Sequence, residues 1–221
     1  MKRLFFCLLG ILLLAACARQ PIHVPPEMAP RVDDVLPSSC LAVFPQGSWQ
    51  LVHQLEFSSA ERFSSRLIGV TILTADGLHC ALVSVEGVTL FEARAVHAQT
   101  LEVLRAVPPF DRPAFGAGLL ADLRLLFRSP AGTLQPGRQP DGRDVCRSHA
   151  GDGRVVDILP PVDGRWQIRE YHLDRDRSVV VEAVADNRLG RSGIASSLVV
   201  QVRGEADYEL EITLIEATVV P

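Results

Sequence analysis

The chain has 221 residues, of which 48% are hydrophobic and only 6% aromatic, and its formal net charge at pH 7 is −4. This hydrophobic fraction excludes an intrinsically disordered chain and is sufficient for the core of one domain. The mildly acidic balance argues against nucleic acid as a partner, because nucleic-acid-binding proteins carry a basic stripe.

The N-terminus has the pattern of a secretory signal. A positive start, Met1-Lys-Arg3, precedes an apolar run over residues 4–14, and Leu14-Ala-Ala-Cys17 follows. The run is too short to cross a bilayer as a helix, which needs about 20 residues. The cysteine after small residues resembles the lipobox of bacterial lipoproteins, in which the cysteine receives acyl chains such as palmitate. We therefore expect residues 1–16 to be a signal peptide and Cys17 to be the lipidated N-terminus.

Residues 17–40 are expected to hold this lipidated N-terminus and a tether. Five prolines lie between positions 21 and 37, and such a segment stays extended and semi-rigid. In lipoproteins of Gram-negative bacteria, an Asp after the cysteine resembles a signal for retention in the inner membrane. Ala18 stands there instead, which implies a lipid-anchored protein on the periplasmic face of the outer membrane. We expect residues 41–221 to form one domain.

Alternating residues predict strands in the first half of this domain. Trp49, Leu51, His53 and Leu55 share one apolar face of a strand that reaches Phe57. Further strands are expected at 67–74, 78–85 and 88–96, with Asp-Gly and Glu-Gly turns between them. Short links between strands predict an antiparallel meander. We interpret His53 as a core histidine, which is more frequent on an apolar face than a catalytic base.

A helix is expected from Phe115 to Phe127. An apolar stripe with helical spacing runs along it, made of Leu119, Leu120, Leu123, Leu126 and Phe127. Pro130 and Gly132 end the helix. A strand that begins near Leu123 is the alternative for the second half of this segment.

The second half of the chain returns to strands. Residues 132–153 are rich in Gly, Pro, Asp and Arg and are interpreted as a long loop. Strands are expected at 155–159, 166–173, 179–185, 197–202 and 208–219, with a turn over 160–164. The total is nine or ten strands and one helix, which indicates a mainly β (α+β) fold.

Once Cys7 is removed with the signal peptide and Cys17 is lipidated, three cysteines keep a thiol, namely Cys40, Cys80 and Cys146. An exported protein enters an oxidising compartment, so one disulfide is expected. The spacing does not choose among the three pairings. Because Cys80 lies within a predicted strand, the pair Cys40–Cys146 is favoured. Three unpaired thiols remain the alternative.

No motif for catalysis or metal binding is complete. Gly190-Arg-Ser-Gly193 lacks the GxSxG spacing of hydrolases, and Cys146-Arg-Ser-His149 lies in the predicted loop. The acidic residues between 141 and 157 do not follow the order of a calcium-binding EF-hand, and no zinc-binding spacing is found. We therefore expect a protein that is not an enzyme and has no metal or cofactor.

The helix and the residues after it carry a resemblance. Leu119-Leu-Ala-Asp-Leu-Arg-Leu-Leu-Phe127, followed by Pro130-Ala131 and Leu134, resembles the central signature of a family of uncharacterised, LolB-like bacterial outer-membrane lipoproteins. Genes of that family often lie in aryl-polyene lipid clusters. In this chain two residues separate Phe127 from Pro130, which departs from the family pattern. The resemblance covers the chain from about Gln46 onward.

The resemblance implies a fold and a function. LolA and LolB proteins are incomplete antiparallel β-barrels with a helical plug, and acyl chains bind between sheet and plug. It implies a protein that binds acyl or polyene chains and assists lipid or lipoprotein placement at the outer membrane, with a periplasmic carrier protein as partner. The cavity is then expected at Leu119, Leu120, Leu123, Leu126, Phe127, Trp49, Leu51 and Leu55. The alternative is a structural or interaction lipoprotein with a filled core and no ligand.

Overall fold

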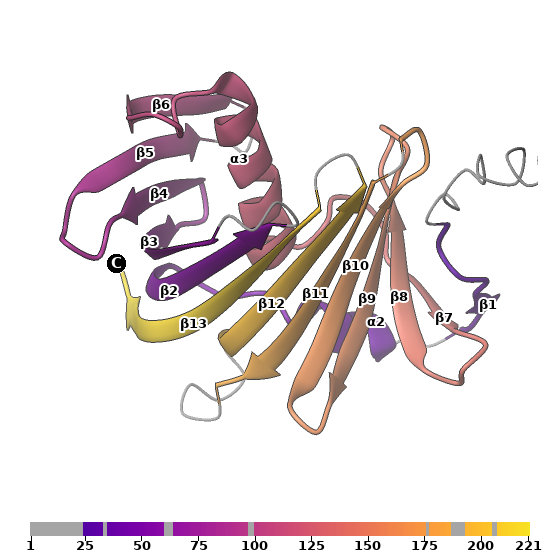
Figure 1. Cartoon of the computed structure of the whole chain (residues 1–221). Helices are drawn as coiled ribbons and strands as arrows, with labels where there is room; N and C mark the ends of the chain where they lie inside the picture. Colours follow the sequence, from indigo (N-terminus) through magenta and orange to yellow (C-terminus); the bar gives the residue numbers. More distant parts are fainter. Residues whose placement is uncertain are drawn as a thin grey trace, which may run out of the picture.

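Strands dominate the molecule, whose computed structural model describes residues 24–32, 35–59, 64–96, 100–175, 177–186, 193–204 and 207–221. These residues form two α-helices, α2 (Leu36–Leu41) and α3 (Pro113–Phe127), and one antiparallel sheet of 13 strands (Figure 1). The strands are β1 (Ala29–Pro30), β2 (Trp49–Ser59), β3 (Ser64–Leu73), β4 (Gly77–Val83), β5 (Thr89–Val96), β6 (Thr100–Ala106), β7 (Gln135–Arg138), β8 (Asp144–His149), β9 (Arg154–Val162), β10 (Arg165–His172), β11 (Arg177–Ala185), β12 (Ala195–Gly204) and β13 (Tyr208–Val219).

The strand order is β1-β7-β8-β9-β10-β11-β12-β13-β2-β3-β4-β5-β6. Two meanders, β2–β6 and β7–β13, are therefore joined where the last strand pairs with β2. A register shift between Leu214 and Glu216 interrupts this pairing, and irregularities of this kind bend a strand. In Figure 1 the sheet curves at β13, and β2–β6 turn over one face of the remaining strands. Because β1 and β6 are opposite edges, the barrel is incomplete, as the family resemblance implied.

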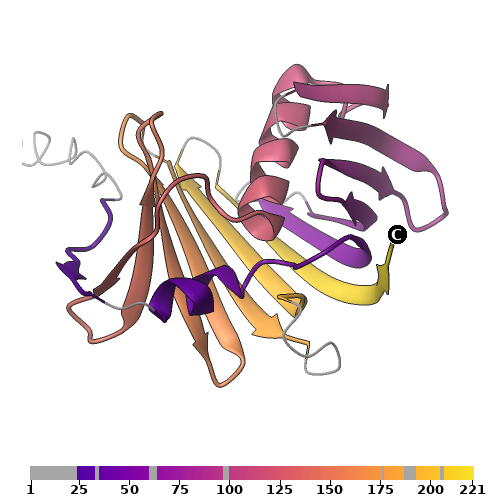
Figure 2. The same ribbon diagram turned by 180° about the vertical axis from the view of Figure 1, so that it is seen from behind.

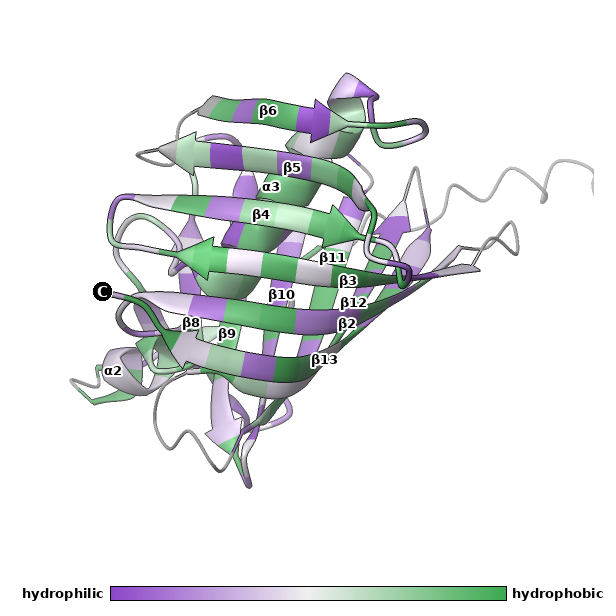
Figure 3. Ribbon diagram, turned by 90° about the vertical axis from the view of Figure 1, so that its left-hand side faces the viewer, coloured by the Kyte–Doolittle hydropathy of each residue, from purple (hydrophilic) through white to green (hydrophobic). Residues whose placement is uncertain are grey.

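Both helices cover the concave face of this sheet (Figure 2). Buried and less buried residues alternate along β4 and most of β12, and inward-facing residues of β2, β4, β10 and β12 join α3 in one core cluster. Leu51 and Val181 are completely buried, and Ile168 is 1% exposed. Hydrophobic and more hydrophilic residues alternate along much of β2–β5 (Figure 3), as expected for strands with one buried face. The core therefore lies inside the curve, beneath the helices.

Tight turns account for the correctly predicted strands. Asp76 and Gly77 lie where β3 turns into β4, and Gly87 has the positive φ of 88° that a tight turn between β4 and β5 requires. The predicted turn at 160–164 is shorter than expected. β9 continues through Val162, and only Asp163 and Gly164 turn, both with positive φ as two-residue hairpins prefer.

The long loop predicted at 132–153 is wrong. This segment contains β7 and β8, which pair with each other from Gln135–Arg147 to Arg138–Asp144. Pro136 lies next to the sheet edge, where proline is tolerated, and its carbonyl still accepts a hydrogen bond from the Arg31 amide at 3.0 Å. Gly and Asp residues in the connecting turns produced a loop-like composition over two short strands.

The strand β6 was not predicted. Its inward residue Leu101 pairs with Ala95 of β5, and a register shift between Glu92 and Ala93 adjusts the pairing. Val103 and Leu104 are both about half exposed, at 49% and 45%. An edge strand with apolar residues on both sides lacks the clean alternation of a half-buried strand.

The expected end of the tether at residue 40 is also wrong. Ala29–Pro30 pairs with β7, and Leu36–Leu41 is a helix with Leu36 and Cys40 buried. Pro37 does not oppose this helix, because proline is tolerated in a first turn, where the amide has no helical partner. The packed part of the chain therefore begins before residue 41. Residues 1–16 and Cys17 lie outside the described residues.

A disulfide fixes α2 to the sheet. Cys40 of α2 and Cys146 of β8 are bonded, with a sequence separation of 106, and Cys80 is a free, buried cysteine. This is the pairing that the sequence favoured. Burial raises the pKa of the Cys80 thiol to about 11, which makes it an unreactive core residue.

Candidate functional site

The helix α3 is the plug of the incomplete barrel. At its first turns, Gly116 lies so close to β6 that an added Cβ would be 3.0 Å from the Leu101 side chain. At its last turn, the Phe127 ring stacks on the His53 ring of β2, with centroids 5.9 Å apart. The helix therefore lies across the concave face from the edge strand to β2.

Polar contacts fix α3 on its other side. The Tyr208 hydroxyl donates a hydrogen bond of 2.8 Å to the Asp122 carboxylate, and the Arg177 guanidinium lies 3.6 Å from the same group. Burial raises the pKa of Asp122, although the contacts with Tyr208 and Arg177 act to lower it. Burial and the negative charge of Asp122 both raise the pKa of Tyr208. Asp122 thus connects the helix to β13 and β11.

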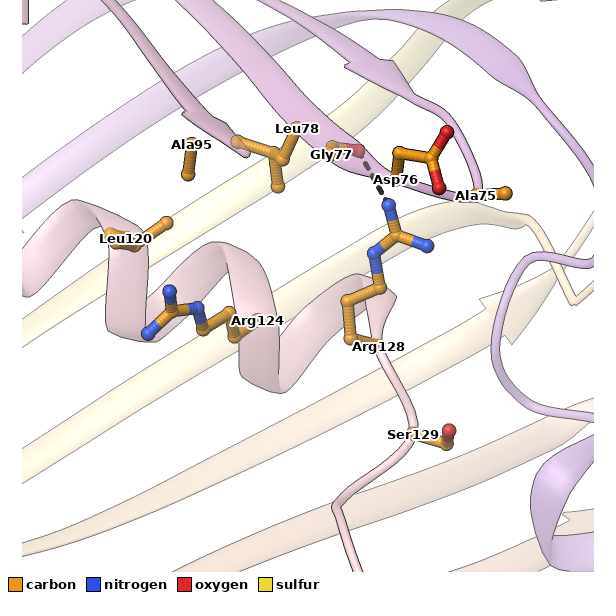
Figure 4. A pocket seen from close by; sticks show the side chains of 9 residues that line it. All are labelled: Ala75, Asp76, Gly77, Leu78, Ala95, Leu120, Arg124, Arg128 and Ser129. Carbon is orange, nitrogen blue, oxygen red and sulfur yellow. Dashed lines mark hydrogen bonds between the residues drawn. The ribbon is translucent and has the colours of Figure 1, made fainter. Parts of the chain in front are cut away.

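Two hollows lie between α3 and the β3–β6 part of the sheet. The first, which we call the hairpin hollow, has a volume of about 420 Å³ and lies where the β3–β4 turn meets the last turns of α3 (Figure 4). It is lined by Ala75, Asp76, Gly77, Leu78, Ala95, Leu120, Arg124, Arg128 and Ser129.

The second, the edge hollow, has a volume of about 600 Å³ and lies between β5, β6 and the first turns of α3. It is lined by Phe91, Leu101, Val103, Ala106, Phe110, Asp111, Arg112, Pro113, Gly116, Ala117, Leu120 and Arg124. Leu120 and Arg124 border both hollows, which therefore lie next to each other along the helix, and we call the two together the α3 groove. Each volume is in the range of small-molecule sites, about 300–1,000 Å³.

Arg128 closes one end of the α3 groove. Its Nη2 donates to the carbonyls of Thr74 and Gly77, at 2.5 Å and 2.6 Å, and so ties the end of the helix to the β3–β4 turn (Figure 4). The Gly77 carbonyl also accepts a hydrogen bond of 3.0 Å from the Thr74 amide, so Arg128 shares an acceptor of the β3–β4 turn. The hairpin hollow is thus bounded by a hydrogen-bonded contact between helix and sheet.

The residues expected to line the cavity have two locations. Leu120 lines both hollows. The other seven lie in the core cluster or pack against it: Leu51, Leu123, Leu126 and Phe127 are buried, and Trp49, Leu55 and Leu119 are partly buried. The leucine stripe was therefore correct as the buried side of a helix, but most of it fills the core beneath the α3 groove. The sequence did not identify the groove residues Arg112, Arg124 and Arg128, because no motif marks these arginines, which lie in or next to α3.

His53 is a core histidine, as expected. It is 4% exposed, and burial lowers its pKa from 6.5 to about 4, because the charged imidazolium is disfavoured away from water. The unfolded chain takes up a proton on this residue below about pH 6.5, whereas the folded chain takes it up only near pH 4. Stability is therefore lost as the pH falls through this window.

We expect the titration of His53 to lower the free energy of unfolding by about 2 kcal/mol as the pH falls from about 8 to about 5. His53→Phe keeps a ring against Phe127 and removes the titrating group. Between pH 8 and pH 5 the variant should therefore lose about 2 kcal/mol less free energy of unfolding than wild type. Urea unfolding at several pH values measures the difference, with the exposed His149→Gln as control. Equal pH slopes for wild type and His53→Phe would contradict the assignment.

The other sequence candidates have structural roles. Cys146 is in the disulfide and Asp157 forms a buried ion pair with Arg147 at 2.6 Å, while Gly190 and Ser192 lie outside the described residues. Within the described ranges, no three His, Cys, Asp or Glu side chains gather as a metal site. Neither α2 nor α3 has the length and hydropathy that a membrane-spanning helix needs.

Comparison with known proteins identifies the fold. No family model matches the sequence, and no curated protein matches it. Among solved structures, a LolA superfamily protein from Nitrosomonas europaea is similar, with a TM-score of 0.56 and 10% sequence identity over 85% of this chain and 92% of that one. At this identity the likeness shows a LolA-like fold, which agrees with the open sheet and its helical plug.

Proposed function

We propose that the chain is a membrane-anchored lipoprotein that binds acyl or polyene chains in the α3 groove and assists lipid or lipoprotein placement at the outer membrane. The observation that carries the proposal is the groove itself, which lies between plug and sheet and has a largely apolar lining that includes Phe91, Leu101 and Leu120. Burial of apolar surface gives about 25 cal/mol per Å² whatever the shape of the chain, so such a site favours hydrocarbon without fine selection.

Three further features support this assignment. The similar structure is described as a LolA superfamily protein, and the fold gives a reason to expect a lipid or lipoprotein as ligand. The disulfide between Cys40 and Cys146 is typical of a protein in an oxidising compartment, which supports export. The lipobox at Cys17 supplies an anchor, and more than one acyl chain is needed for stable attachment to a bilayer. A periplasmic carrier that delivers the ligand is the partner we propose.

A second function is favoured by one observation. The core beneath α3 is well buried, since Leu73 and Ile168 are 1% exposed and Leu51 is completely buried. A protein of this kind also suits a structural or interaction role at the membrane, in which the α3 groove holds no ligand.

Lipid extraction distinguishes the two functions. We expect residues 18–221, exported behind a cleavable signal and purified without detergent, to carry lipid that mass spectrometry detects after organic extraction. The same protein should take up a fluorescent fatty acid until one equivalent is bound, and unlabelled fatty acid should displace it. Lipid-free protein that takes up no dye would favour the structural role instead.

A further inference from the structure

We infer that residues 24–31 hold the β1–β7–β8 edge of the sheet against the bilayer in which Cys17 is anchored, so that the α3 groove faces away from that bilayer. The inference rests on the proposed function, because it takes Cys17 as the lipidated N-terminus. The partner of this edge is then a lipid surface, and the groove is reached from the periplasm.

Backbone contacts fix residues 24–31, which we call the docked segment, to the edge of the sheet. Ala29–Pro30 pairs with β7 in antiparallel register. Gly137 of β7 permits this close approach, because a Cβ added there would be 2.5 Å from Met28 Cγ and 2.8 Å from the Ala29 carbonyl oxygen. The segment therefore lies on the sheet instead of serving as a free tether.

Two side chains of β8 also hold the docked segment. Asp144 forms an ion pair with the Arg31 guanidinium at 3.1 Å, and Arg147 donates from Nη2 to the Pro26 carbonyl at 2.9 Å. Arg147 is 8% exposed and is itself held by its ion pair with Asp157 at 2.6 Å. Pro26 is therefore fixed on β8, and the chain toward the N-terminus leaves the domain beside this strand.

The chain that connects the anchor to the docked segment is short. Six residues, 18–23, separate Cys17 from Val24. An extended chain spans at most about 3.6 Å per residue, so Val24 lies within about 25 Å of Cys17 in any conformation of these residues. A compact domain of roughly 200 residues has a radius of gyration of about 16 Å, which corresponds to a diameter of about 40 Å. The connecting chain is therefore shorter than the domain is wide.

The α3 groove lies on the opposite side of the molecule from the docked segment. β1 and β6 are the two edges of the 13-stranded sheet, and Figures 1 and 2 show β1 and β7 at one side with β6 and α3 at the other. If the groove faced the bilayer, the docked segment would lie on the far side of the domain, beyond the reach of the connecting chain. The membrane therefore lies beside β1, β7 and β8.

The charged side chains of this edge are paired with one another. Arg31 and Arg138 both pair with Asp144, at 3.1 Å and 3.0 Å, and Arg143 pairs with Asp141 at 2.7 Å. Opposite charges this close largely cancel at the distance of a lipid headgroup. The length of the connecting chain, and not attraction to anionic lipid, therefore sets the orientation, and a neutral bilayer suffices to test it.

Fluorescence quenching on phosphatidylcholine vesicles tests the inference with the full-length lipoprotein. Bimane is attached to a cysteine at one of two exposed positions, His149→Cys at the end of β8 or Ala114→Cys in the first turn of α3. When a lipid with a nitroxide on its headgroup is included, the label at position 149 should lose most of its fluorescence, and the label at position 114 should keep it. Wild type should take no label, because Cys80 is buried and Cys40 and Cys146 are bonded.

Gly137→Ala should release the docked segment, because the added methyl group meets Met28 and the Ala29 backbone. The connecting chain then extends to the start of α2 and reaches up to about 70 Å. Quenching should fall at position 149 and rise at position 114. Gly151→Ala is the matched control and should leave both signals unchanged, since the same methyl group there meets no atom within 4 Å.

A longer connecting chain tests the same point without any change to the packed residues. About twenty glycine and serine residues inserted after Gln20 increase the maximum reach to about 95 Å, more than twice the diameter of the domain. Quenching should again fall at position 149 and rise at position 114, while circular dichroism stays unchanged. This variant tests the inference even where Gly137→Ala fails to fold.

The outcomes separate the inference from the proposed function. Equal quenching at the two positions, or stronger quenching at position 114, overturns the inference while the anchor and lipid binding stand. Unchanged quenching at position 149 after the insertion has the same meaning, because the length of the chain would then not set the orientation. If mass spectrometry finds no acyl groups on Cys17 and the protein does not bind vesicles, the inference and the proposed anchor are both overturned.

Discussion

Replacing Cys40 and Cys146 together by alanine is expected to lower the free energy of unfolding by about 4–5 kcal/mol. The bond closes a segment of 106 residues, and restricting a loop of about 100 residues in the unfolded chain is worth about 4.7 kcal/mol in the chain-entropy model. The loss equals about a third to the whole of the stability of an ordinary domain, about 5–15 kcal/mol. Chemical denaturation with and without reductant measures it.

The control for this prediction is Cys80→Ala. Cys80 is buried and free, so its replacement removes a sulfur from the core without opening a loop. The expected result is a smaller loss that does not depend on reductant, whereas wild type should approach the double variant when reduced. A double variant as stable as wild type would show that α2 packs on β7–β9 without help from the covalent bond.

The strands followed from sequence wherever one local rule determined them. β2 alternates apolar and polar residues over most of its length, and β13 has Leu210 and Ile212 inward against exposed Glu211. The stripe of α3 likewise predicted its buried side, because helical spacing places Leu123 and Phe127 together. Turn residues then limited the register, as Asp163 and Gly164 do for β9 and β10.

The rest depended on contacts between distant segments. The strand β7 contains Pro136 and Gly137 and forms because β1 and β8 lie on either side of it. In the same way α2 has no apolar period of its own, and a bond to residue 146 holds it. The α3 groove likewise forms only when distant segments meet, since the β3–β4 turn, β6 and α3 contribute to it from three parts of the chain. Only Leu120 combined a predicted helical face with a place in the groove.

Leu120→Trp is expected to abolish uptake of fluorescent fatty acid, with at least about a hundredfold loss of affinity if the tail occupies either hollow. Leu120 is 7% exposed and borders both hollows, so a larger ring at this position occupies space on both sides at once. Burial of each methylene contributes about 0.8 kcal/mol, and displacing three or four of them from the groove accounts for a loss of this size. Dye titration of residues 18–221 measures it.

Ala121→Trp is the matched control for this prediction. Ala121 is the next residue of α3 and is exposed, so the same ring there points into solvent and should leave uptake unchanged. The leucine stripe alone suggests Leu123 as a test position, but Leu123 is buried and is not among the residues that line the two hollows, so a charge there would test folding instead of binding. Undiminished uptake by a folded Leu120→Trp protein would mean that the ligand lies elsewhere, because Leu120 borders both hollows and a chain in either of them would meet the larger ring.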